Sequence, residues 1–330
     1  MERVLATDIG THEGKEAVLM GWVNIRRDHG KIIFIDLRDR SGIAQCVFLA
    51  KDAELYERAG TLRPEWVVRL AGTVAKRPDN MVNPDLLNGA WEVKAVSLEI
   101  LNEAETPPIA IGTEGYEISE EHRLKYRYVD LKRERLQKNL ALRHEAISFM
   151  RDWLSTRDFT EVETPIISKS TPEGARDYLV PSRIYPGKSF ALPQSPQQYK
   201  QLLMVAGLER YFQFARCFRD EDTRGDRQPE FTQLDLEMSF VAQEDVMRLI
   251  EDLYVATIET LMPEKKIQEK PFPRLSYKEA MEKYGSDKPD LRKDANDPDL
   301  LAFAWIVDFP FFEQTNGGKW ILRWTAPSDD

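Results

Sequence analysis

Residues that build metal centres and disulfide frameworks are scarce in this chain. It has two cysteines and four histidines among 330 residues. Cys46 and Cys217 lie far apart, each inside an apolar strand-like pattern, and no His or Cys spacing matches a zinc site. We therefore expect both thiols to be reduced core residues, as is typical of cytoplasmic proteins.

Long apolar runs are missing as well. The N-terminal segment contains no apolar core of a signal peptide, and no later segment reaches the roughly 18 apolar residues of a membrane span. We therefore expect a cytoplasmic location and no membrane partner. The net charge of −10 excludes a chain that coats nucleic acid with its whole surface, so a nucleic-acid partner requires a local basic face.

Five strand-like runs occupy residues 1–102, with one short helical run between the third and the fourth. The strands are expected at Ala17–Arg27, Lys31–Arg38, Gly42–Leu49, Glu65–Arg77 and Trp91–Leu101, and the helix at Ala53–Ala59. This order is typical of the five-stranded OB-fold barrel, whose second and third strands commonly bind oligonucleotides. The sequence therefore predicts an OB-fold domain over residues 1–102.

An aromatic ring lies among polar neighbours on the second strand. Alternation separates Phe34 from the apolar face of Ile33 and Ile35. An exposed ring beside a basic turn suits base stacking. The neighbouring polar residues are Arg26, Arg27, His29 and Lys31 in the turn, with Gln45 on the third strand. The alternative is that Phe34 covers a small satellite core and that the arginines are solvated.

A proline-containing linker, Asn102–Gly115, and a basic run, His122–Lys138, follow the barrel. We expect a hinge over residues 103–133 and a second domain over residues 134–330. The basic run is expected to be a solvated helix face, and the alternative is contact with a phosphate backbone near the hinge. The second domain begins with a long amphipathic helix, because apolar residues recur at helical spacing. These residues are Leu136, Leu140, Ile147, Met150 and Leu154.

A strand and a polar loop come next. Phe159–Ser168 resembles a strand, but Pro165 cannot donate to a ladder and places it at a sheet edge. An edge beside an apolar helix invites pairing with a second copy, so we expect a homodimer interface at Pro165, with a plain edge strand as the alternative. The loop Thr171–Asp177 either closes over a ligand or is a surface connection.

Two strand-like runs, Tyr211–Arg219 and Glu230–Val241, carry polar residues on one face each. Period-two counting groups Gln213 and Cys217 with Arg219, and likewise Gln233 and Glu237 with Asp235. The charged loop Asp220–Pro229 between the runs is too long for a tight hairpin turn. This pattern predicts an active site laid out on strands.

The charges of this region suit a ligand with an ammonium group, two carboxylates and a neighbouring phosphate. Arg219 can bridge two anions in a fixed fork geometry, and Lys200 suits a single carboxylate. Glu173 and Asp235 supply negative charge for an ammonium group. An amino-acid dicarboxylate together with ATP has this set of groups. The alternative is a buried salt-bridge network without a ligand.

Several long motifs resemble those of class II aminoacyl-tRNA synthetases. Phe218–Asp222 and Arg227–Asp235 look like motif 2, and Glu163-Thr164-Pro165 looks like part of motif 1. Thr171–Arg183 and Gln194–Lys200 narrow the resemblance to the bacterial-type aspartyl-tRNA synthetases of subclass b. The resemblance implies an α+β architecture in which an antiparallel-sheet catalytic domain follows the OB-fold.

The resemblance also implies an aspartate–tRNA ligase that uses ATP and Mg²⁺, forms aspartyl-adenylate from L-aspartate and charges tRNA-Asp. Lys200 would bind the substrate side-chain carboxylate, and Glu173 and Asp235 its ammonium group. Arg219 would be the catalytic residue that joins the aspartate carboxylate to the α-phosphate. The other implied contacts are Ser195, Gln197 and Gln233 for aspartate and Asp220, Glu221 and Gln228 for ATP.

In the OB domain, the resemblance assigns the tRNA anticodon to a face where a base stacks on Phe34 and is read by Gln45. Arg27, His29 and Asn80 are the further implied contacts. A histidine at position 29 resembles the type that charges tRNA-Asn in addition to tRNA-Asp, whereas Asn80 adds no support for this dual specificity.

Two parts of the family pattern are absent. The inserted domain expected after Tyr284–Arg292 is missing or nearly so, and Ile321–Pro327 stands where the family continues toward motif 3. Motif 3 supplies an arginine for ATP, with Mg²⁺ ligands upstream, so no metal ligands are identified. We therefore expect a C-terminally incomplete catalytic domain. The alternative function is a truncated, non-catalytic paralogue or fragment that binds tRNA or an acidic amino acid.

Overall fold

The computed structural model describes residues 2–84, 86–171, 173–223, 227–314 and 320–322. Of the segments singled out above, Pro172, residues 224–226 and residues 323–327 lie outside the described residues. The chain forms two compact units, Met1–Asn139 and Leu140–Asp330. The division falls inside helix α4 (Glu134–Ser155), which contributes to both units.

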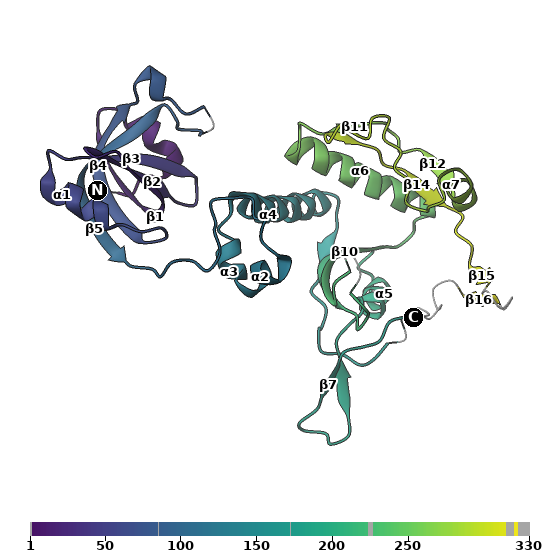
Figure 1. Cartoon of the computed structure of the whole chain (residues 1–330). Helices are drawn as coiled ribbons and strands as arrows, with labels where there is room; N and C mark the ends of the chain where they lie inside the picture. The colour runs from purple at the N-terminus through teal and green to yellow at the C-terminus, as the bar shows by residue number, and fades with distance from the viewer. Residues whose placement is uncertain (1, 85, 172, 224–226, 315–319, 323–330) are drawn as a thin grey trace. The chain divides into compact units, whose positions relative to one another are not determined.

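The first unit contains the predicted OB-fold. Its strands are β1 (Glu16–Asp28), β2 (Ile32–Arg38), β3 (Ile43–Leu49), β4 (Val67–Lys76) and β5 (Trp91–Asn102). They close into a barrel in the order β1-β2-β3-β5-β4, drawn in purple and blue in Figure 1. Helix α1 (Ala53–Thr61) connects β3 to β4, as the sequence predicts. All five expected strands and the helix are confirmed.

The barrel core follows the alternation of the strands. Ile33 and Ile35 are buried, and Cys46 of β3 joins the same cluster. A 3-10 helix that the sequence pattern does not reveal, η1 (Ala6–His12), adds the buried Ile9. Both cysteines are unpaired and buried, as expected.

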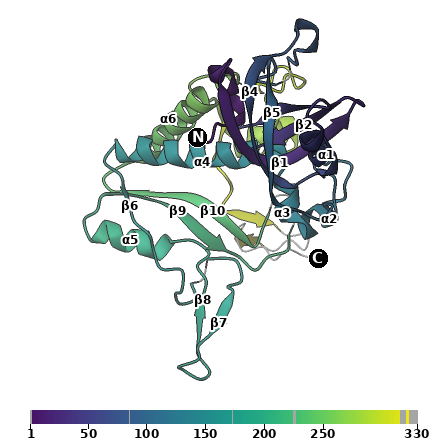
Figure 2. The same cartoon turned by 90° about the vertical axis from the view of Figure 1, so that its left-hand side faces the viewer.

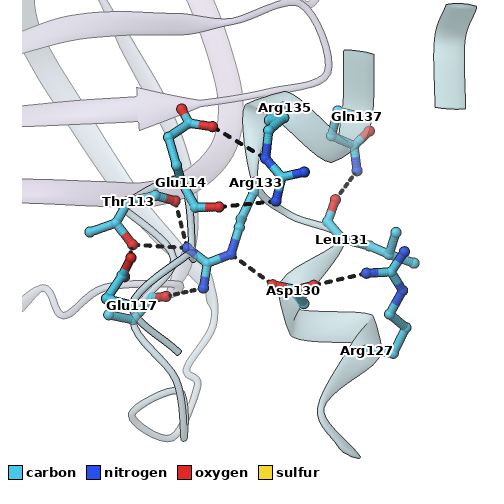
Figure 3. A network of polar contacts seen from close by, with 10 residues as sticks. Thr113, Glu114, Glu117, Arg127, Asp130, Leu131, Arg133, Arg135 and Gln137 are labelled. Carbon is cyan, nitrogen blue, oxygen red and sulfur yellow. Dashed lines mark hydrogen bonds and ion pairs between the residues drawn. The ribbon is translucent and has the colours of Figure 1, made fainter. Parts of the chain in front are cut away.

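The segment between the barrel and α4 is folded around a buried ion pair. It contains two short helices, α2 (Glu120–Lys125) and α3 (Arg127–Asp130). The Nε atom of Arg133 lies 2.7 Å from Oδ1 of Asp130, and these residues are 2% and 0% exposed. Figure 3 shows the Arg133 guanidinium also donating to the carbonyl oxygen of Thr113. The expectation of a solvated basic face is therefore wrong at Arg133, which ties the proline-containing linker to the start of α4.

The second unit is built on a three-stranded sheet of order β10-β9-β6. Strands β9 (Arg210–Phe218) and β10 (Glu230–Met238) are antiparallel, and β6 (Thr160–Glu161) runs parallel to β9 at the edge. The C-terminal half of α4 and helix α6 (Gln243–Leu261) cover one face, and α5 (Gln197–Val205) lies on the other (Figure 2).

Two sequence expectations for this unit need correction. The strand expected over Phe159–Ser168 is only two residues long, although it does lie at the edge of the described sheet. The apolar stripe of α4 is not buried along its whole length, since Leu154 is 0% exposed whereas Leu140 is 50% exposed. Helical periodicity predicts an apolar face, but it does not predict which part of that face is covered within one copy of the chain.

The remaining elements are short. Strands β7 (Leu179–Pro181) and β8 (Ser189–Ala191) form a projecting hairpin, visible in Figures 1 and 2. The later elements are β11 (Lys266–Ile267), β12 (Arg274–Ser276), α7 (Tyr277–Tyr284), β13 (Leu300–Leu301), β14 (Trp305–Val307), β15 (Phe312–Gln314) and β16 (Trp320–Leu322), with η2 (Asp79–Met81) in the first unit. Within the described residues, no helix has the length and apolar composition of a membrane span.

Removing the charge of Asp130 tests the folded linker. We expect Asp130→Asn to lower the free energy of unfolding by about 3 kcal/mol at pH 7, because Arg133 keeps a buried charge without its partner. Burial alone raises the pKa of Asp130, but Arg133 outweighs it and holds this pKa below the ordinary 3.8. The pair therefore stabilises the fold fully above pH 3.8, and the difference between variant and wild type should shrink as the pH falls below it.

Urea denaturation followed by circular dichroism at several pH values measures this difference. The exposed Asp252 of α6 provides the matched control, and Asp252→Asn should leave stability unchanged. An Asp130→Asn variant as stable as the wild type would contradict a structural role of the pair.

Candidate active site and nucleic-acid face

The β9–β10 register gathers polar side chains on one face of the sheet. Gln213 lies opposite Asp235, and Tyr211 opposite Glu237. These residues point away from the apolar face formed by their neighbours, such as Phe212, which packs against α4 and α6. The predicted sharing of one face by the polar residues of both strands is confirmed, and α5 lies over this face.

Lys200 of α5 is held between two carboxylates of β10. Its Nζ atom lies 2.7 Å from Oδ1 of Asp235 and 3.3 Å from Oε2 of Glu237. Lys200 is only 9% exposed, so these contacts are shielded from water. Burial raises the pKa of Asp235 even though Lys200 acts in the opposite direction. Lys200 and Asp235, which the sequence analysis assigns to different groups of one ligand, are therefore direct neighbours.

Arg219 follows β9 directly and is partly buried. Its guanidinium lies 5.2 Å from the centre of the Phe231 ring, and its backbone nitrogen donates to the carbonyl of Pro229. The buried Nε of Arg219 has no hydrogen-bond partner among the described residues. An unsatisfied guanidinium donor in a partly buried site is suited to binding an anion.

The loop Thr171–Asp177 brings Glu173 to the same region. Oε2 of Glu173 accepts a hydrogen bond of 2.6 Å from the hydroxyl of Ser195, which in turn accepts from the backbone nitrogen of Gln197. Oε1 of Gln233 accepts from Sγ of Cys217. Burial, above all, raises the pKa of Cys217 to about 11, so this thiol is protonated near neutral pH.

The expected nucleotide contacts are less well defined than the aspartate contacts. Asp220, Glu221 and Gln228 are exposed. In the described part of the chain, no hydrogen bond or ion pair links their side chains to Arg219. Two pocket residues were not assigned a role from the sequence. Glu237 was visible in the strand alternation, whereas the buried Gln194, which binds the Glu173 loop, has no periodic signal.

The charge balance of the pocket favours a cationic group on the ligand. Lys200 and Arg219 contribute two positive charges, and Glu173, Asp235 and Glu237 contribute three negative charges, which leaves a net charge of −1. An ammonium group neutralises this excess. Within the described residues, no three His, Cys, Asp or Glu side chains gather as a metal site. We therefore assign no step to Mg²⁺.

On the outer face of the barrel, the aromatic ring of Phe34 lies among polar side chains. Phe34 is half-buried, and the ring of His29 lies edge-on to it at 5.6 Å between centroids. Arg27 makes two hydrogen bonds of 2.7 Å to Asp36, and Asp36 lies opposite Gln45 in the β2–β3 ladder. The predicted alternation of β2 is confirmed, and the structure brings Arg27, Phe34 and Gln45 to one face.

Two further residues of this face were not predicted. Nε2 of Gln45 donates to Oε2 of Glu92 at 3.3 Å, and Nε of Arg77 donates to the carbonyl of Trp91. Arg77 is 6% exposed, and its Nη2 has no hydrogen-bond partner among the described residues. Asn80 lies apart in η2 and is exposed.

Comparisons with known proteins agree with both units. The family of OB-fold nucleic acid binding domains matches residues 17–101, and the family of class II tRNA synthetases (D, K and N) matches residues 119–326. An aspartate–tRNA(Asp/Asn) ligase from Rubrobacter xylanophilus is 56% identical over 299 residues, which cover 91% of this chain and 50% of the relative. The corresponding ligase from Dehalococcoides mccartyi is 58% identical over 280 residues, which cover 84% and 46%.

A solved structure has the same fold. The asparaginyl-tRNA synthetase from Pyrococcus horikoshii, in complex with asparaginyl-adenylate, superposes with a TM-score of 0.73 at 27% identity, over 86% of this chain and 66% of that chain. The chain spans about half the length of the curated relatives it matches. The class II match alone covers more than half of the chain, and the chain therefore belongs to the class II tRNA synthetase family of the D, K and N type.

Proposed function

We propose that this chain supplies the anticodon-binding domain and the first part of the active site of an aspartate–tRNA ligase. The observation that carries the proposal is the cluster of Glu173, Lys200, Arg219 and Asp235 around one sheet face. Relatives that share more than half of their aligned residues with this chain are named aspartate–tRNA(Asp/Asn) ligases. No contact among the described residues favours a non-catalytic paralogue over a ligase.

Aspartate has a group for four of the five charges of the pocket, and the fifth, Glu237, is paired with Lys200. Lys200 would bind its side-chain carboxylate, a group that asparagine lacks. Glu173 and Asp235 would bind the ammonium group, with Ser195 holding Glu173 in place through the 2.6 Å hydrogen bond. Gln197 and Gln233 complete the pocket. Because Lys200 has Asp235 as its neighbour, aspartate binding requires the lysine to exchange part of that contact for the ligand.

Arg219 would hold two anions together. It would bring the α-carboxylate of aspartate and the α-phosphate of ATP into contact, so that the carboxylate attacks phosphorus in line and pyrophosphate leaves. The chemistry depends on positioning and on charge stabilisation. Asp220, Glu221 and Gln228 would contact ATP. The resemblance implies Mg²⁺ as well as ATP, but no cluster among the described residues would hold the metal, and no step is assigned to it.

The barrel would bind the anticodon of tRNA-Asp. Phe34 offers a ring for base stacking, steadied by His29, and Gln45 offers an amide for a base edge. Arg27 and Asn80 are the further proposed contacts. The name of these relatives also includes tRNA-Asn, and His29 is the residue through which we extend the proposal to that tRNA.

We also propose that the chain assembles as a homodimer. The segment after β6 exposes Pro165, Ile166 and Ile167, of which the isoleucines are 45% and 59% exposed. Leu140 of α4 is 50% exposed as well. Exposed aliphatic side chains at a sheet edge are typical of a surface that pairs with another copy.

Replacing Lys200 tests the aspartate pocket. We expect Lys200→Met to weaken aspartate binding about a hundredfold or more, because the substrate carboxylate loses its charged partner. The preference of the wild type for aspartate over asparagine should disappear. Isothermal titration calorimetry with both amino acids measures these effects, and Lys278→Met, at an exposed lysine of α7, is the control.

An equal loss of tRNA affinity in Lys200→Met would contradict the pocket assignment. Exchange of pyrophosphate into ATP that depends on aspartate tests the ligase reaction itself. A chain that binds aspartate and tRNA but shows no exchange would instead support the non-catalytic binding protein.

Two substitutions at Phe34 separate stacking from simple burial. We expect Phe34→Leu to weaken binding of a tRNA-Asp anticodon stem-loop by about 1–3 kcal/mol, whereas Phe34→Trp should bind as well as the wild type. Fluorescence anisotropy with the labelled stem-loop measures the affinity. Unchanged binding by Phe34→Leu, together with a lower melting temperature, would restrict Phe34 to a packing role.

A charge at the exposed edge tests the dimer. We expect the wild type to be a dimer at micromolar concentration and Ile167→Glu to be a monomer, because the interface would bury an unpaired carboxylate. Sedimentation velocity measures the mass. Leu124→Glu, at a residue that is 59% exposed in the first unit, should remain dimeric. A monomeric wild type would refute the interface.

A further inference from the structure

Gln194 is a buried side-chain amide with three polar contacts to one loop. Its Oε1 accepts from the backbone nitrogen of Ala175 at 3.1 Å, and its Nε2 donates to the carbonyl oxygen of Ala175 at 2.9 Å. Nε2 also donates to Oδ1 of Asp177. Gln194 is 1% exposed, so water does not compete for these bonds. The amide therefore satisfies both backbone groups of Ala175, as a neighbouring strand would.

The residue after Gln194 binds the same loop at a second point. Ser195 donates to Oε2 of Glu173, two residues before Ala175. The other oxygen of Asp177 is also occupied, because the hydroxyl of Ser170 donates to it. The loop is thus held at Glu173, Ala175 and Asp177, and two of these three points depend on Gln194.

We propose that Gln194 is a positioning residue that places Glu173 for the ammonium group of the substrate. This inference rests on the proposed function, because it assumes that Glu173 contacts aspartate. Gln194 itself contacts the loop at the backbone of Ala175 and at the carboxylate of Asp177. Its role is to fix the distance between Glu173 and the sheet face that carries Asp235.

Only an amide can make this set of bonds. An amide presents an acceptor and two donors at once, whereas an ionised carboxylate presents acceptors only. Gln194→Glu would therefore leave the carbonyl of Ala175 without its donor and place two carboxylates side by side at Asp177. Protonation of the new carboxyl restores one donor. The charged side chains on the surrounding segments are Glu173, Arg176, Asp177, Arg219 and Asp220.

The pH dependence of aspartate binding distinguishes positioning from general stability. We expect Gln194→Glu to bind aspartate about tenfold more weakly than the wild type at pH 7.5. The ratio of the variant's aspartate dissociation constant to that of the wild type should recover toward one at pH 5.5, because burial raises the pKa of the new carboxyl. Gln194→Met, whose side chain lacks both donor and acceptor, should bind aspartate more weakly than the wild type at both pH values. Gln198→Glu, at an exposed glutamine of α5, should match the wild type throughout.

Trypsin cleavage after Arg176 gives a readout that needs no substrate. At pH 7.5, without aspartate, we expect faster cleavage in Gln194→Glu and Gln194→Met than in the wild type and in Gln198→Glu. An unchanged cleavage rate in Gln194→Glu would overturn the inference. So would an aspartate affinity of this variant that equals that of the wild type, or an affinity ratio that does not change with pH. A wild type that fails to bind aspartate would refute the proposed function, and the cleavage rates would still decide whether Gln194 holds the loop.

Discussion

The antiparallel register of β9 against β10 decides on which face of the sheet the strand residues of the candidate pocket lie. With Gln213 opposite Asp235, the polar side chains face α5 and their neighbours face α4 and α6. A shift of one residue would turn Asp235 into the apolar layer and expose its neighbours. The burial of Phe212 and Leu253, both 0% exposed, therefore stabilises the polar arrangement from the opposite side of the sheet.

This arrangement buries charged side chains, which costs folding stability when no ligand is bound. Burial raises the pKa of Asp235 despite the nearby ammonium of Lys200, and a donor of Arg219 remains unsatisfied among the described residues. Groups of this kind gather where a ligand completes their contacts. The face of the barrel differs, because Arg27 is neutralised by Asp36 while Phe34 keeps part of its ring accessible.

The sequence predicts most of the fold, because period-two alternation is strong where one strand face is packed. It predicts the face of Phe34 and the grouping of Asp235 with Gln233 for this reason. The sequence does not reveal η1, because this element is too short to show a helical period. It does not reveal the burial of Arg133 either, because one of its partners is a backbone carbonyl, which every residue has. The role of Gln194 is not visible in the sequence because two of its three hydrogen bonds are to the backbone of Ala175. The pocket roles came from family resemblance and remain proposals.

The burial of both cysteines has a practical consequence for biophysical work on the chain. Cys46 and Cys217 are each 0% exposed, and thiol reagents require access as well as a thiolate. The native thiols should therefore not react with maleimide dyes while the chain is folded. Single engineered cysteines, for example at the exposed Val96 of β5 and Val246 of α6, can then carry a fluorophore pair without a cysteine-free background. Energy transfer between such dyes would report the distance between the two units in solution.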